Sequence, residues 1–138
     1  QSYMTSMNTI YKALLLVASL FIGTLSLSAQ FVTSRDGKFW REGKPYYYVG
    51  TNLWYGAILG SEGQGGNRAR LCRELDFLKR NGIDNLRILV GSDGERGVKT
   101  KVEPTLQVAP GVYNDTILAG LDYLLQQMGK RKMVVLHL

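Results

Sequence analysis

Residues 83–90 read Ile-Asp-Asn-Leu-Arg-Ile-Leu-Val, and this stretch indicates the fold class. The run is nearly continuous in apolar residues and is bounded by Gly82 and Gly91. Short runs of this kind are typical of parallel strands whose two faces are both covered. We therefore expect a buried strand here, ending at Gly91.

One amphipathic helix is expected before this strand in the sequence, and another after it. Upstream, Cys72 and several leucines recur at helical spacing between Asn67 and Arg80, and a glycine after Asn81 supplies a left-handed stop. Downstream, Asn114 can cap a helix whose apolar stripe runs to Met128.

Two further strands complete the pattern. The aromatic run from Pro45 to Gly50 predicts the first strand, and residues 133–138, MVVLHL, predict the third. A small hairpin around Asp36-Gly37 is expected before them, within residues 31–40. The order strand, helix, strand, helix, strand predicts a parallel sheet, either an open doubly wound sheet or a (β/α)8 barrel.

The amino terminus resembles a secretory signal. From Met7, the basic Lys12 precedes an apolar run that begins at Ala13, and small residues lead to Ala29. The run is shorter than the ~20 residues of a membrane span. We expect residues 1–29 to be extra residues and a signal peptide, and the protein to be secreted (extracellular or periplasmic), without a membrane anchor.

Charge and cysteine content exclude several function classes. The chain of 138 residues carries a net charge of +6, and cleavage after Ala29 would leave 16 bases against 11 acids. The bases are dispersed, apart from residues 130–132, which are typical of a helix end, so nucleic acid is disfavoured. Cys72 is the only cysteine and is expected to be a small buried hydrophobe. We expect no metal and no cofactor.

The glycine-rich stretch 60–70, GSEGQGGNRAR, follows the first predicted strand and raises the question of a phosphate loop. Arg68 stands where the third glycine of a dinucleotide loop would be, and no Gly-Lys-Ser or Gly-Lys-Thr occurs in the chain. We favour a long loop at the carboxyl end of the strand, where barrel enzymes bind substrate. A small nucleotide-binding domain remains a third alternative.

Residues 51–56, TNLWYG, offer a sugar-binding group. Trp54 and Tyr55 present flat apolar faces, and Asn52 adds an amide beside them. Sugar rings stack on such aromatics and hydrogen-bond through their hydroxyls. The alternative is that one or both aromatics pack under the loop.

Arg87 and His137 are the remaining candidates. Arg87 lies among apolar residues, so we expect its guanidinium to be removed from water and to meet a carboxylate at the floor of a cleft. A structural salt bridge to Asp84 or Asp93 is the alternative. His137, the only histidine, lies near the end of the third strand and belongs either to the cleft or to the core.

Several motifs together resemble one family. They are residues 39–55, residues 59–66 (LGSEGQGG), residues 85–91 (NLRILVG), and residues 103–107 with 111–116. They are similar to the start of glycoside hydrolase family 5 enzymes, specifically endo-β-1,4-mannanases. The resemblance implies a (β/α)8 TIM barrel. Residues 30–138 would be its amino-terminal portion, truncated to a hairpin, three strands and two helices.

The resemblance also implies residue roles. Arg87 matches an arginine that supports the catalytic nucleophile, and Trp54 matches an aromatic of the sugar cleft. From the residues themselves, Tyr55, Asn52 and His137 are predicted to be further substrate contacts. The implied substrate is a β-mannan polysaccharide, and we expect a monomer.

The two catalytic glutamates of the family follow strands four and seven, outside this chain. Retaining hydrolysis needs both carboxyl groups, about 5–5.5 Å apart, and a barrel takes about 250 residues. We therefore expect the chain alone to be inactive. A β-1,4-glucan-cleaving enzyme and a non-catalytic carbohydrate-binding protein remain alternatives.

Overall fold

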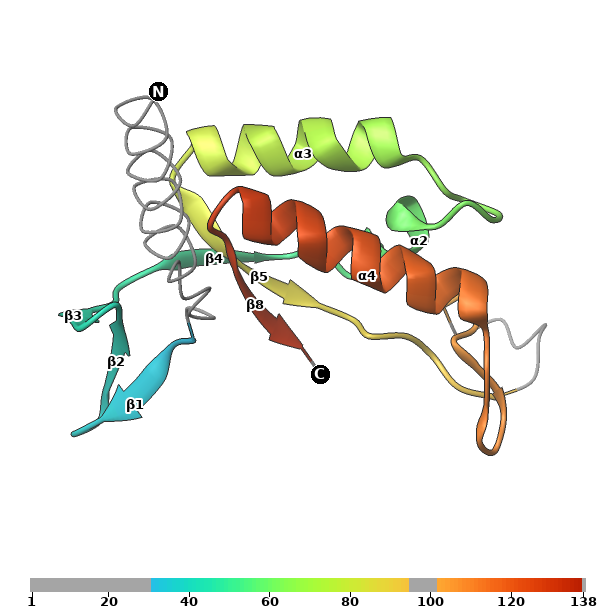
Figure 1. The fold of residues 1–138 in the computed structure, drawn as a ribbon, viewed down its shortest axis with the longest axis horizontal. Helices are drawn as coiled ribbons and strands as arrows, with labels where there is room; N and C mark the ends of the chain where they lie inside the picture. Colours follow the sequence, from blue (N-terminus) through green and yellow to red (C-terminus); the bar gives the residue numbers. More distant parts are fainter. Residues whose placement is uncertain (1–30, 95–101, 138) are drawn as a thin grey trace, which may run out of the picture.

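The computed structural model describes residues 31–94 and 102–137 (Figure 1). The predicted signal peptide therefore lies outside the described residues. Within the described residues, no helix has the length and apolar character needed to cross a membrane.

An antiparallel sheet opens the described chain. It is formed by β1 (Thr33–Arg35), β2 (Lys38–Arg41) and β3 (Lys44–Pro45). Asp36 and Gly37 both have positive φ, 52° and 69°, as a two-residue turn of this hairpin requires. The predicted hairpin is confirmed.

The central sheet is parallel and has the order β4-β5-β8. Its strands are β4 (Val49–Asn52), β5 (Ile83–Ile88) and β8 (Val134–His137). The prediction of a first strand from Pro45 to Gly50 is wrong in its bounds. Pro45 instead ends β3, and the Tyr46 amide donates to the carbonyl of Phe39 in the hairpin, so this aromatic run first serves the small sheet.

The two predicted helices are confirmed. The first, α3 (Arg68–Arg80), begins after Asn67, whose side chain accepts a hydrogen bond from the Arg70 amide. The second, α4 (Asp115–Lys130), begins after Asn114, whose side chain accepts from the Thr116 amide. Figure 1 shows both helices on the same side of the central sheet.

The core fills the space between these helices and the sheet. Leu86 and Ile88 of β5 point into it, and so do Leu71 and Leu75 of α3 and Leu124 of α4; all five are at most 2% exposed. Among the described residues, no helix lies over the other face of the sheet (Figure 1). The expectation that β5 is covered on both faces is therefore wrong for the described residues.

A short helix that the sequence analysis missed packs closely on α4. It is α2 (Gly56–Gly60), and it lies at the start of the glycine-rich stretch. A Cβ atom on Gly60 would lie 2.3 Å from the carbonyl oxygen of Gly120, and one on Gly120 would lie 2.2 Å from that of Ala57. These glycines are needed because the two helix backbones touch.

The segment between β5 and α4 adds the small hairpin of β6 (Gln107–Ala109) and β7 (Val112–Tyr113), which was also not predicted. Three parallel strands among the described residues are too few to close a barrel. The architecture is a mixed and partial α/β fold.

Candidate functional site

The carboxyl ends of the central strands bring Asn52 and Arg87 together. Asn52 of β4 and Leu136 of β8 both lie in register with Arg87 of β5. The Arg87 Nη1 atom donates to Asn52 Oδ1 at 3.4 Å, and all three side chains are exposed. The row crosses the sheet on the face that no helix covers.

Arg87 differs from the expectation in its surroundings. Its guanidinium is exposed, and no ion pair is recorded for it among the described residues. Asp84 is engaged elsewhere, because it accepts a hydrogen bond from the Tyr46 hydroxyl at 3.1 Å and lies 3.5 Å from Arg41. The expected desolvation of the guanidinium is therefore not observed among the described residues, because that expectation assumed that both faces of β5 are covered.

Trp54 lies beside this pair and is 52% exposed. Together with Asn52, Arg87 and the end of β5 it lines a hollow of about 90 Å³. An exposed indole, an amide and a guanidinium therefore converge at one strand end. This combination can stack on a ring and hydrogen-bond its hydroxyls.

Tyr55 is held differently. Its ring meets Trp54 edge to face, with centroids 5.3 Å apart and an interplanar angle of 86°. Its hydroxyl donates to Glu74 Oε2 of α3 at 2.9 Å, and partial burial, followed by this hydrogen bond, raises the Tyr55 pKa. The structure thus joins the Tyr55 hydroxyl to the helix layer, whereas Trp54 borders the hollow.

His137 is the last residue of β8 and lies in register with Ile88. Its side chain lies outside the part of the chain that the structure describes. The group formed by Asn52, Trp54 and Arg87 contains no carboxylate. Across residues 31–94 and 102–137, no three His, Cys, Asp or Glu side chains are grouped to hold a metal ion.

The glycine-rich stretch uses its backbone internally. The Gly66 amide donates to the Gly63 carbonyl at 3.0 Å, and the Asn67 amide donates to the Leu59 carbonyl at 2.8 Å. A Cβ atom on Gly66 would lie 2.2 Å from the Ser61 oxygen, so the loop is tightly folded. A phosphate cradle needs free amides, which these two residues do not offer.

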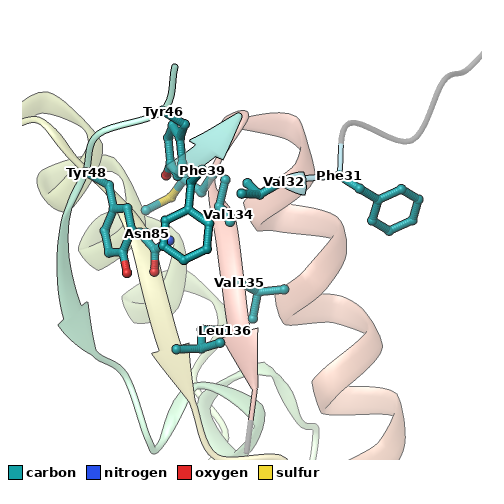
Figure 2. Close-up of a pocket in the computed structure, with 10 residues that line it drawn as sticks. Phe31, Val32, Phe39, Tyr46, Tyr48, Asn85, Val134, Val135 and Leu136 are labelled. Carbon is teal, nitrogen blue, oxygen red and sulfur yellow. The ribbon is translucent and has the colours of Figure 1, made fainter. Parts of the chain in front are cut away.

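An apolar cavity of about 410 Å³ lies between the hairpin and the strands β5 and β8 (Figure 2). Figure 2 shows Phe39, Tyr46, Tyr48 and Asn85 gathered beside β5 and β8. The Tyr46 and Tyr48 rings are stacked with centroids 5.4 Å apart. No charged side chain lines this cavity, so it offers packing and no acid or base.

Sequence analysis missed a polar cluster that joins the hairpin to the amino ends of the strands. Arg41 donates to the Lys132 carbonyl at 2.8 Å and pairs with Asp84, which also holds Tyr46. Burial is the main cause that raises the Tyr46 pKa. The available signal was Asp84, an acidic residue next to the apolar Ile83 at the start of β5.

Cys72 is partly buried between α3 and α4 and has polar neighbours. Its sulfur lies 3.6 Å from the Tyr123 hydroxyl and 3.7 Å from Gln127 Oε1. The hydrogen bond with Cys72 is the main cause that raises the Tyr123 pKa. The expected fully buried hydrophobe is therefore half-buried and hydrogen-bonded.

Several solved structures of glycoside hydrolases are similar to this fold. Among solved structures, a glycoside hydrolase family 5 mannosidase from Rhizomucor miehei is 36% identical, with a TM-score of 0.74 over 78% of this chain and 27% of that one. A structure of that mannosidase contains mannosyl-fructose. The endo-1,4-β-mannanase of the same organism is 22% identical, with a TM-score of 0.58 over 78% of this chain and 29% of that one.

A curated plant protein is also similar to this chain. Mannan endo-1,4-beta-mannosidase 1 of Oryza sativa subsp. japonica is 29% identical over 72% of this chain and 21% of its own length. The chain thus spans about a fifth to about a quarter of the length of these relatives. The family model described as GH family 5 beta-mannosidase-like matches residues 29–138. The chain therefore belongs to the β-mannosidase-like group of glycoside hydrolase family 5.

Proposed function

We propose that this chain forms the substrate-binding amino-terminal part of a secreted, monomeric, retaining glycoside hydrolase that cleaves internal β-1,4-mannosidic bonds in mannan. The observation that carries the proposal is the convergence of Asn52, Trp54 and Arg87 at the carboxyl ends of neighbouring parallel strands. That end of the strands is where barrel enzymes hold their substrates.

Each member of the group has a role in the proposal. The exposed Trp54 indole stacks on a sugar ring, and Asn52 hydrogen-bonds a hydroxyl while it holds the Arg87 guanidinium at 3.4 Å. Arg87 contacts and orients the carboxylate nucleophile, since its remaining N–H donors are exposed on the open face. Tyr55 supports the ring of Trp54.

The acid/base and nucleophile glutamates belong, in this proposal, to segments outside these 138 residues. Retaining hydrolysis needs both carboxyl groups, and an arginine can replace neither of them. We expect the purified 138-residue chain to release no reducing ends from mannan. Steady hydrolysis by that chain would contradict this part of the proposal.

The role of Arg87 is tested in an active protein that contains this chain together with the missing strands. Arg87→Ala should lower kcat at least about a hundredfold, as loss of a preorganised charge at a reacting group does. Arg87→Lys should recover little, because a single ammonium lacks the fork geometry. Cooperative melting of each variant verifies that its fold is kept. Unchanged kcat would remove the role.

A second candidate is a mannosidase that removes single mannose units. The observation that favours it is the identity of 36% to the Rhizomucor miehei mannosidase, against 22% to the mannanase of that organism. Product analysis separates the two. An endo-acting enzyme lowers the viscosity of mannan before mannose appears, whereas a mannosidase releases mannose from the first minutes and leaves viscosity nearly unchanged.

Similar experiments test the two alternatives that the sequence left open, a β-1,4-glucan-cleaving enzyme and a non-catalytic carbohydrate-binding protein. Parallel assays on β-1,4-glucan test the glucanase alternative. Saturable binding of mannan to the 138-residue chain, lost in Trp54→Ala, would be the expected result for a carbohydrate-binding protein without catalysis.

A further inference from the structure

A second hollow, of about 440 Å³, lies at the amino ends of the central strands, at the opposite end from Asn52 and Arg87. It is open to solvent and is formed where the hairpin meets the ends of α3 and α4. Its lining combines three bases, two acids, two tyrosines and a proline: Arg41, Lys79, Lys132, Glu42, Asp84, Tyr46, Tyr47 and Pro45.

The positive charge of this hollow is only partly compensated. Arg41 pairs with Asp84, but no ion pair is recorded within the described residues for Lys79 or Lys132, and both are exposed. The dipole of α3 favours a base at Lys79, in its last turn. Lys132 lies beyond the end of α4 with a φ of 53°, so helix propensity does not account for it.

Three further bases lie within two residues of lining residues in the sequence. Lys44 ends the hairpin turn, and Arg80 and Lys130 close the two helices; all three are exposed. The ion pair of Arg131 with Asp76, at 2.7 Å, ties the helix ends to each other. The bases that line the hollow, Arg41, Lys79 and Lys132, thus come from three separate segments.

Aromatic rings lie among these charges. Tyr47 is 81% exposed, which is unusual for an aromatic ring. Tyr46 beside it is fixed by its hydrogen bond to Asp84 and by stacking on Tyr48. An exposed ring next to two ammonium groups can stack on a pyranose while the ammonium groups bind carboxylates on it.

We propose that this hollow binds a carboxylate-bearing sugar chain, a polyuronate, and so attaches the protein to acidic polysaccharide independently of the site at Asn52 and Arg87. The lining favours a sugar over a nucleic acid because Glu42 can accept hydrogen bonds from hydroxyls, which a polyuronate carries on every ring and a DNA backbone does not.

The test is a calorimetric titration of the full chain with a polygalacturonate oligomer of defined length at low ionic strength. Lys79→Gln combined with Lys132→Gln should weaken binding at least about tenfold. A matched control, Lys38→Gln with Arg73→Gln, removes the same charge at exposed residues outside the hollow and should weaken binding less than about twofold. Cooperative melting of each variant verifies its fold.

Two further arms define the ligand. Tyr47→Ala should weaken polygalacturonate binding at least about threefold, and an oligothymidylate of equal charge should bind more weakly than polygalacturonate. The proposal is overturned if polygalacturonate does not bind, or if the lysine double variant and its matched control lose the same affinity. Tighter binding of the oligothymidylate, or an unchanged affinity in Tyr47→Ala, would also overturn it. None of these outcomes depends on hydrolytic activity, so failure here leaves the proposed function standing.

Discussion

The two faces of the central sheet have opposite surroundings although they belong to the same strands. On one face Leu86 is fully buried under α3 and α4, and on the other Arg87 and Leu136 are exposed, the latter by 51%. The covered face supplies the cohesion of the chain, and the open face presents the candidate sugar site. Stability and function are therefore assigned to residues that alternate along a single strand.

The largest expected effect separates these faces directly. Leu86→Ala should lower the free energy of unfolding by about 3 kcal/mol, because it leaves a cavity between helices and sheet. Leu136→Ala, in the neighbouring strand, should cost less than about 1 kcal/mol because its side chain is already half in water. Urea unfolding monitored by circular dichroism measures both. Equal losses would mean that the open face is covered in solution.

A matched glycine pair sharpens the comparison within α4. Gly120→Ala should cost about 1–3 kcal/mol, since its Cβ would meet the backbone of α2. Gly129→Ala meets nothing within 4 Å and should be neutral or stabilising by up to about 1 kcal/mol. Thermal melting of the two variants gives the sign. The idea fails if both substitutions shift the melting temperature in the same direction.

A smaller effect is expected at the start of α3. Asn67→Ala removes the acceptor of the Arg70 amide, which lies at 2.9 Å, and should cost about 1 kcal/mol. Asn67→Asp keeps the acceptor and should restore most of the loss. Chemical denaturation of the parent and the two variants makes the comparison. If Asn67→Asp is as unstable as Asn67→Ala, the loss comes from the side-chain amide group of Asn67 and not from its role as hydrogen-bond acceptor.

The smallest expected effect on stability depends on pH and concerns the ion pair between Arg131 and Asp76. The hydrogen bond from Arg131, together with its charge, lowers the Asp76 pKa below its unfolded value. A lowered folded-state pKa stabilises the protein above the unfolded value of about 4, and this contribution is lost as pH falls through the folded-state pKa. Asp76→Asn should therefore be less stable than the parent at neutral pH. Unfolding curves at pH 7 and pH 2.5 should show a smaller stability difference between the two proteins at the lower pH.

Local signals sufficed for much of the architecture. The Asp36-Gly37 turn and the caps at Asn67 and Asn114 were predictable because each depends on residues within a few positions. The parallel sheet was predictable because strands and helices alternate along the chain. The strand that begins at Val49 was misplaced, since aromatic content alone does not say which sheet the run from Pro45 joins. The helix α2 was missed because its glycines are explained only by α4, sixty residues away in the chain.

The residues of the candidate site could be predicted from the sequence, but the groups that surround them could not. The sequence by itself determined that Asn52, Trp54 and Arg87 follow or end parallel strands, since the side-chain period and the strand order are local properties. Tertiary structure decided that Arg87 is exposed beside Asn52 and that Tyr55 is bound to Glu74. It also decided that Asp84 serves Arg41 and Tyr46. Burial and partner choice depend on which segments pack over a face, and that is set by contacts between residues far apart in the chain.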